Sequence, residues 1–221
     1  YIKDNIMSTK ALLCGRGRSL KHYKNLQTDD FDFVCLVNEF NRFIKEDEEL
    51  LYFLKTLSKN SFLTQQVNIC ASGVDQYLLN NLNVKEITST RLSFNGDRNW
   101  RRDPVDTGIL NNLNREIILQ PEIISSHMSH VENSLGVAIL NLILEKKCNE
   151  IIIIGSDFYE DDYYLSHKEY DWEETSTKET QDRLKKGFDY LIKTFSRIRF
   201  NIYTCSTYKN DSVNCNITRI E

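Results

Sequence analysis

A glycine-containing turn near the N-terminus has the residue types that hold a phosphate. An apolar run from Ala11 to Cys14 leads directly into Gly15-Arg16-Gly17-Arg18-Ser19-Leu20. Glycines at the end of a buried strand let the backbone turn sharply and approach a ligand closely, and the N–H groups that open a following helix bind anions. The turn therefore predicts a nucleotide site, although two glycines at this spacing also suit an ordinary strand-to-helix turn.

Two polar side chains follow other apolar runs. Asn38 comes directly after the run Phe33–Val37, and Tyr159 comes shortly after the run that ends at Ile154. An asparagine at a strand end either binds a ligand or satisfies its own loop backbone. A tyrosine hydroxyl can stabilise developing negative charge without a metal, whereas the alternative for Tyr159 is plain packing.

The residues Asn133, Ser134 and Gly136 stand at the start of a predicted helix. Unpaired N–H groups at a helix start can meet a phosphate or a carboxylate. Asn133 or Ser134 can equally cap the helix, and the two roles are compatible.

Histidine is the default general base for activating a hydroxyl near neutral pH. Four are present. His167 lies in a stretch rich in charge and tyrosine, His127 and His130 precede the helix that starts near Asn133, and His22 beside the glycine turn is expected at the surface.

Two groupings raise the question of a metal. His127 and His130 supply only two ligands, and no local cysteine or carboxylate completes the set. The run Glu160-Asp161-Asp162 offers the oxygen ligands that hard divalent cations prefer, but it also suits a solvated acidic loop. We predict no metal site.

Apolar strand-like runs alternate with helix-like stretches along the chain. The strand-like runs are Ala11–Cys14, Phe33–Val37, Gln66–Ala71, Glu116–Leu119, Glu150–Ile154 and Phe200–Cys205. The helix-like stretches are Glu46–Leu57, Asp75–Leu82, Leu135–Lys147 and Glu179–Ser196. This alternation predicts an α/β fold with a doubly wound parallel sheet, in which the unbroken apolar run Ile151–Ile154 is a central strand.

Polar stretches predict long loops or lids at Thr88–Asp106 and Glu160–Thr180. The chain has only two prolines and eight glycines among 221 residues, and no linker stands out. We therefore predict one domain over residues 1–221, with a lid segment at about 160–180.

Composition excludes some classes of function. A net charge of -4 argues against a sequence-independent nucleic-acid binder, because such proteins carry a basic excess. No apolar stretch approaches the roughly 20 residues that span a bilayer. Six scattered cysteines without CxxC pairs fit a reducing, cytoplasmic setting.

Three segments together resemble a known family. They are Leu12–Leu20, Asp30–Phe40, and the stretch that begins with Ser134-Leu135-Gly136 and ends with Gly155-Ser156-Asp157-Phe158-Tyr159. In order and spacing they resemble the bacterial sialyltransferases that include the Campylobacter lipooligosaccharide enzymes, and more distantly the animal sialyltransferases. The segments cover about a third of the chain.

The resemblance implies a single Rossmann-like domain of variant GT-A type with a lid, using a CMP-sugar, such as CMP-sialic acid, without a metal or other cofactor. It implies that Tyr159 and a second tyrosine, for which we favour Tyr164 over Tyr163, support the departing CMP phosphate. The implied donor-binding residues are Gly15, Arg16, Gly17, Ser19, Asn38, Asn133, Ser134, Gly136 and Asp157.

Two positions depart from the family pattern. Arg16 stands where the family has an amide; a guanidinium there can bind a phosphate or a carboxylate, or point to solvent. The family's base histidine precedes the last long helix, where this chain has Thr177-Lys178-Glu179. His167 is therefore the predicted base, with His127 and His130 as alternatives.

These inferences predict an inverting sialyltransferase-like enzyme that transfers a sugar from a CMP-sugar to a glycan acceptor. One alternative is a transferase that uses another CMP-sugar, such as a Kdo-like acid, and a second is a metal-dependent transferase that uses a different nucleotide sugar, with the metal at Glu160 to Asp162. A third is a non-catalytic nucleotide- or glycan-binding module. A bacterial relative builds lipooligosaccharide or capsule at the inner face of the membrane, so peripheral membrane association stays open, as does a homo-oligomer.

Overall fold

The structure is a computed structural model that describes residues 8–27, 31–37, 47–57, 61–68, 81–82, 84–91, 116–119, 126–131, 133–160 and 177–221. The strands are β1 (Lys10–Cys14), β2 (Phe33–Val37), β3 (Ser61–Asn68), β4 (Val84–Arg91), β5 (Glu116–Leu119), β6 (Glu150–Ile154), β7 (Arg199–Thr204) and β8 (Cys215–Arg219). The helices are α2 (Glu48–Thr56), α6 (Ser134–Leu144) and α8 (Lys178–Thr194), with the 3-10 helices η1 (Arg18–Asn25) and η2 (Met128–His130).

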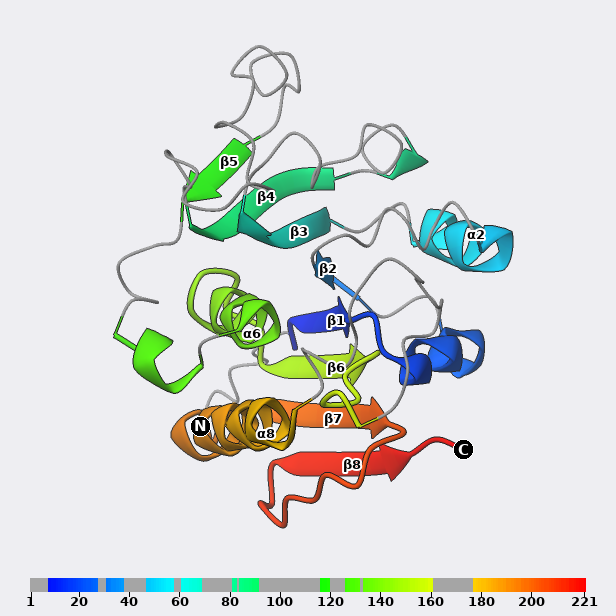
Figure 1. Cartoon of the computed structure of the whole chain (residues 1–221). Coiled ribbons are helices and arrows are strands. Elements are labelled where there is room, and N and C mark those ends of the chain that lie inside the picture. Colours follow the sequence, from blue (N-terminus) through cyan, green and yellow to red (C-terminus); the bar gives the residue numbers. More distant parts are fainter. Residues whose placement is uncertain are drawn as a thin grey trace, which may run out of the picture.

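The strands form one parallel sheet in the order β5-β4-β3-β2-β1-β6-β7-β8 (Figure 1). The chain winds outward from β1 to β5, then crosses to the other side of β1 to form β6. Leu12 of β1 accordingly lies opposite Val34 on one side and Ile152 on the other. The doubly wound parallel sheet predicted from the sequence is confirmed, and its order reverses between β1 and β6.

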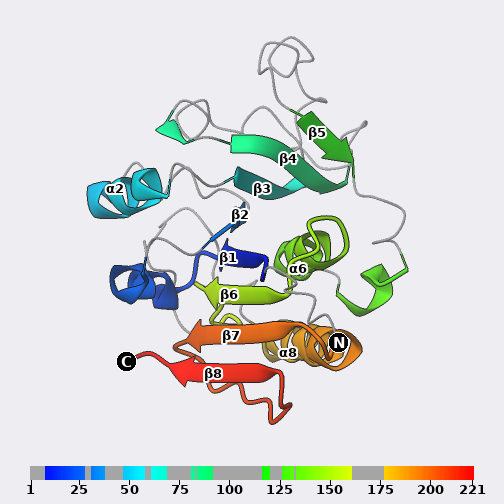
Figure 2. The same ribbon diagram turned by 180° about the vertical axis from the view of Figure 1, so that it is seen from behind.

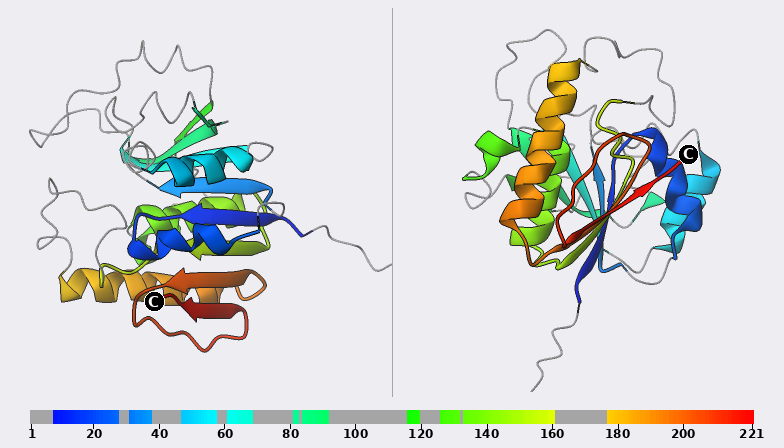
Figure 3. Two further views of the ribbon diagram at one scale, coloured as in Figure 1. Left: turned by 90° about the vertical axis from the view of Figure 1, so that its right-hand side faces the viewer. Right: turned by 90° about the horizontal axis from the view of Figure 1, so that it is seen from below.

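Each face of the central strands builds its own core, because successive side chains point to opposite faces of a strand. On one face Leu12, Val34 and Ile152 pack with residues of η1 and α2. On the other Leu13 and Ile153 pack with residues of α6 and α8. Figures 2 and 3 show these helices as two layers, one on each side of the twisted sheet.

The helices α2, α6 and α8 each begin at a residue whose side chain accepts a backbone N–H, which satisfies one of the free donors of the first turn. Asp47 accepts from Leu50 N at 2.8 Å at the start of α2. Thr177 accepts from Thr180 N at 3.2 Å at the start of α8. No helix in the described part of the chain is long and apolar enough to cross a membrane.

The edges of the sheet differ from the prediction. The third strand starts at Ser61 rather than Gln66, and β4 and β8 are additional strands. The prediction of a loop from residue 88 is wrong as far as Arg91, which ends β4. These strands carry polar side chains between apolar ones, and β8 is half exposed at the sheet edge, so they lack the unbroken apolar run of a central strand.

The helix before β6 ends at Leu144 rather than Lys147. Lys147 adopts a left-handed φ of 57°, which does not continue the helix, and the side chain of Lys146 pairs with Glu86 of β4. The predicted helix at 75–82 lies outside the described residues except for its last two positions, and of the predicted lid only residues 160 and 177–180 are described.

Candidate functional site

The loops that follow β1 and β6 pack backbone to backbone where the strand order reverses. Gly15 N donates to Ile154 O, and Gly17 N donates to Gly155 O, both at 2.8 Å. A Cβ atom on Gly15 would lie 2.3 Å from Gly155 O, and Gly155 has a left-handed φ of 72°. The glycines are therefore required by the approach of one loop to the other, at the position where open α/β sheets bind nucleotides.

The buried carboxylate of Asp157 joins three loops at this edge. Its Oδ2 accepts from Ser19 N at 2.8 Å, and its Oδ1 accepts from Cys205 N at 2.8 Å. The hydroxyl of Thr204, at the end of β7, lies 3.0 Å from Oδ1 and 2.8 Å from Ser156 O. Asp157 thus fixes the loop after β6 against the loops after β1 and β7.

Ser19 has a similar internal role. It is fully buried, and its hydroxyl accepts from Gly155 N at 3.0 Å. Ser19 and Asp157 make these hydrogen bonds with neighbouring loops. Their predicted contact with the CMP-sugar therefore stays a prediction. Arg16 lies half-buried in the same turn.

The chain from Asp157 to Glu160 forms a tight turn with an uncommon backbone. Glu160 N donates to Asp157 O at 2.9 Å, and the central residues Phe158 and Tyr159 have φ values of 53° and 58°. Asparagine and glycine usually occupy such positions, and a positive φ costs other residues about 1–3 kcal/mol each. Strain of this kind persists only where the surroundings hold it.

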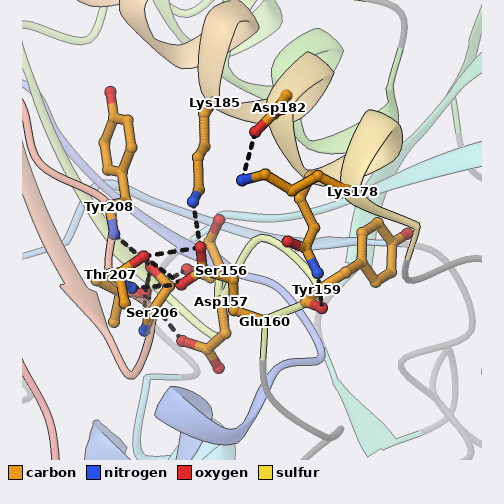
Figure 4. Close-up of polar contacts among 12 residues, drawn as sticks. Ser156, Asp157, Tyr159, Glu160, Lys178, Asp182, Lys185, Ser206, Thr207 and Tyr208 are labelled. Atoms are coloured by element: carbon orange, nitrogen blue, oxygen red, sulfur yellow. Dashed lines mark hydrogen bonds and ion pairs between the residues drawn. The ribbon is translucent and has the colours of Figure 1, made fainter.

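Aromatic packing holds the first central residue of the turn. Phe158 is buried, and its ring centroid lies 4.9 Å from that of Phe188 on α8 and 4.5 Å from that of Tyr208. Tyr159 is half-buried, and its carbonyl oxygen accepts from the side chain of Gln181 on α8 at 3.0 Å. Figure 4 shows the Tyr159 ring pointing away from the polar contacts around Thr207.

The last residue of the turn, Glu160, is held by polar contacts on both sides (Figure 4). Its carboxylate accepts from Thr207 N at 2.5 Å and from the Thr207 hydroxyl at 2.8 Å, and it forms an ion pair with Lys185 of α8. Burial by itself raises the pKa of this carboxyl, but the hydrogen bonds from Lys185 and Thr207 outweigh it, so the pKa lies below its usual value.

These contacts weaken the metal alternative for Glu160. A cation at this carboxylate would compete with the Lys185 ammonium group and the Thr207 N–H for the oxygen lone pairs. Asp161 and Asp162 lie outside the described residues, among which no group of three metal-ligating side chains is found.

At the start of α6 the capping role is observed. Asn133 Oδ1 accepts from Gly136 N at 2.8 Å, and a Cβ on Gly136 would lie 2.9 Å from Val131 Cβ. Ser134 is buried. The cap uses the N–H of Gly136, so an anion at this helix start depends on other donors, and the donor-binding role of the three residues stays a prediction.

The two alternative base histidines lie against Tyr190 of α8. His127 Nδ1 is 2.8 Å from the Tyr190 hydroxyl, and the His130 ring stacks on the Tyr190 ring with centroids 4.1 Å apart. A cavity of about 630 Å³ is lined there by Ser129, His130, Glu179, Asp182, Arg183, Lys186 and Tyr190. Helical spacing places this face of α8 opposite the one that carries Gln181 and Phe188, so the helix separates both histidines from the Asp157–Glu160 turn.

Among the remaining candidates, only His22 belongs to the described residues. It is partly exposed; its ring stacks on that of Tyr203 with the centroids 4.2 Å apart, and partial burial lowers its pKa. Asn38, Tyr163, Tyr164 and His167 lie outside the described residues. The sequence did not point to Lys185, Thr204 and Thr207. The sequence pattern showed only that Lys185 lies on a predicted helix and that the two threonines lie at the end of a predicted strand.

No protein-family model matches the chain, and no curated protein sequence matches it significantly. Solved structures do match. A CstII sialyltransferase with one tyrosine replaced by phenylalanine, in complex with CMP, is 18% identical, with a TM-score of 0.53 over 88% of this chain and 80% of its own. CstII from Campylobacter jejuni with CMP is also 18% identical, with a TM-score of 0.53 over 95% and 84%.

A third structure, the CST-II sialyltransferase with a trisaccharide acceptor and CMP, is 16% identical, with a TM-score of 0.50 over 93% and 83% of the two chains. The chain therefore has the GT-A-like α/β fold of these sialyltransferases. The resemblance expected from the sequence is confirmed at the level of the fold.

Proposed function

We propose that the chain is an inverting, sialyltransferase-like glycosyltransferase that takes its sugar from a CMP-sugar, such as CMP-sialic acid, and transfers it to a hydroxyl of a glycan. The observation that carries the proposal is the strained Asp157–Glu160 turn beside the Gly15–Gly17 loop, at the point where the strand order reverses. The fold supports it, because structures that share it were solved with CMP.

In the proposed reaction the acceptor hydroxyl attacks the anomeric carbon from the face opposite CMP. A new C–O bond forms as the bond to the phosphate oxygen breaks, and CMP leaves with the electron pair. The Tyr159 hydroxyl donates a hydrogen bond to the phosphate as its charge grows, an interaction stronger in the transition state than in the ground state. This stabilisation uses no metal or other cofactor.

The acceptor proton passes to a base, for which we propose His167. Tyr164 is the proposed second tyrosine that contacts the phosphate. At the family position of the base, the chain has Thr177, which caps α8 through its hydroxyl, and then Lys178 and Glu179. This departure favours one second candidate, a module that binds a cytidine nucleotide or a glycan without turnover.

Nucleotide binding is the first test. A thermal-shift screen of CMP, CDP, CTP, UDP and GDP should raise the melting temperature with the cytidine nucleotides, because a ligand that binds only the native state stabilises it. A response confined to UDP or GDP would contradict the CMP-sugar donor and favour another nucleotide sugar.

Turnover separates the enzyme from the module. We expect CMP release from CMP-sialic acid that depends on a glycan acceptor and is unchanged by a chelator. Tyr159→Phe should lower kcat about 100-fold, since it removes one donor to the developing charge. Tyr52→Phe, at an exposed position on α2, is the matched control and should leave kcat unchanged. Cytidine binding without CMP release would favour the module.

The cellular setting is proposed from the resemblance alone. It implies lipooligosaccharide or capsule assembly on the cytoplasmic side of the membrane, with peripheral association and a homo-oligomer as further possibilities. Sedimentation with anionic vesicles and the mass in solution would test these two points.

A further inference from the structure

Two carboxylates flank the strained turn and bind the same neighbouring loop. Asp157, before the turn, accepts from Cys205 N, and Glu160, after the turn, accepts from Thr207 N. Both donors belong to the segment that follows β7. The turn between the carboxylates carries Phe158 and Tyr159 in left-handed conformations. Its two ends are therefore tied to one fixed loop.

The two attachments differ in depth. Asp157 is 3% exposed and joins three loops, so it belongs to the core of this edge. The side chains of Glu160 and Lys185 are 16% and 18% exposed, and their ion pair and the hydrogen bonds from Thr207 join the turn to α8 and to the loop after β7. A change at Glu160 should therefore release the turn without unfolding the sheet edge.

The direction of the Tyr159 side chain depends on this attachment. The backbone φ of a residue sets where its Cβ points, and a tyrosine relaxes to negative φ unless it is held. Gln181 holds the Tyr159 carbonyl, and the Glu160 carboxylate holds the next residue. Loss of the second contact removes the hydrogen bonds that hold the Tyr159–Glu160 end of the turn to the loop after β7.

We propose that Glu160, bound by Lys185 and Thr207, is a positioning residue that keeps the Tyr159 hydroxyl aimed at the departing phosphate. This inference rests on the proposed function for the role of Tyr159. It gives Lys185 and Thr207 a part in the reaction through their contacts with Glu160. A hydroxyl held in place before the reaction needs no reorganisation as charge develops, so its positioning acts on kcat rather than on donor binding.

Glu160→Gln and Lys185→Met test the proposal. We expect each to lower kcat about tenfold with the donor KM changed less than twofold. Lys193→Met is the matched control, because it makes the same substitution at an exposed position two turns further along α8, and it should leave both constants unchanged. Equal losses in the control, or a rise in KM without a fall in kcat, would overturn the proposal.

A double-mutant cycle shows whether Glu160 acts through Tyr159. In a Tyr159→Phe background the Glu160→Gln substitution should cause no further loss of kcat, since the hydroxyl that it positions is absent. Two losses that multiply would mean that Glu160 acts by another route, and would overturn the positioning role.

Hydrogen exchange separates this inference from the proposed function. If the wild-type chain binds no cytidine nucleotide and releases no CMP, the proposed function fails while the attachment of the turn is still measured. We expect the amide of Glu160, which donates to Asp157 O, to exchange at least tenfold faster in Lys185→Met than in Lys193→Met. Equal exchange rates would show that the ion pair does not hold the turn.

Discussion

Two lysine–glutamate pairs of almost equal burial lie at opposite edges of the sheet. Lys185–Glu160 follows the end of β6, with side chains 18% and 16% exposed. Lys146–Glu86 joins the segment before β6 to the start of β4, with side chains 15% and 14% exposed. The first lies beside the Asp157–Glu160 turn at the edge where the strands end, and the second lies at the edge where they begin, beside the left-handed residue Lys147. Similar pairs thus support different properties, because only the first is next to the loops of the candidate site.

A substitution at the backbone contact between the loops after β1 and β6 should cause the largest loss of stability. Gly15→Ala places a Cβ atom 2.3 Å from Gly155 O and 2.9 Å from Gly155 C, and these backbone atoms cannot move aside cheaply. We expect the free energy of unfolding to fall by about 4 kcal/mol, measured by urea denaturation, with loss of cytidine binding. Wild-type stability in this variant would contradict the packing of the two loops.

The pair at the amino edge should act on stability alone. Lys146→Met leaves the half-buried Glu86 carboxylate without its bidentate partner at 2.5 Å. We expect the free energy of unfolding to fall by about 2 kcal/mol, with the nucleotide affinity of the folded protein unchanged. Lys185→Met should show the reverse, a small loss of stability and a larger loss of kcat. Weakened nucleotide binding in Lys146→Met would remove the distinction between the edges.

Each of the two edges also has a non-glycine residue with a left-handed backbone. Lys147 at the amino edge has a φ of 57° and Tyr159 at the carboxyl edge a φ of 58°. Glycine relieves the strain at either position, and we expect Lys147→Gly to raise the free energy of unfolding by about 0.5 kcal/mol with unchanged CMP release. Tyr159→Gly should keep a melting temperature near that of the wild type and lose CMP release. Retained release in Tyr159→Gly would show that its side chain has no role.

Lowering the pH should produce the smallest change in the free energy of unfolding. The pKa of Glu160 is lower in the folded chain than its ordinary value, so its stabilising contribution is complete above about pH 4.3 and is lost as the pH falls through the folded pKa. We expect the stability difference between the wild type and Glu160→Gln to shrink below about pH 4 in urea titrations. A difference that grows on acidification would contradict the lowered pKa.

The central strands were predictable because each is a short apolar run. Glu150–Ile154 and Phe33–Val37 have the predicted bounds, since a parallel strand covered on both faces needs no polar alternation. The strands β4 and β8 could not be recognised in this way. Their side chains are partly polar, and pairing with a neighbouring strand rather than composition makes them strands.

For the site, local patterns identified the turn at Gly15 and Gly17 and the segment that ends at Tyr159, because glycine placement and the end of an apolar strand are visible in a few consecutive residues. The partners of these segments could not be found in the same way. Asp157 binds Ser19 across 138 positions, and Glu160 binds Thr207 across 47. Hydrogen bonds of this kind exist only once parallel strands bring their carboxyl ends together. Candidate residues for the site can therefore be predicted from the chain, whereas the roles of Ser19, Asp157 and Glu160 as loop contacts follow from the order of the strands.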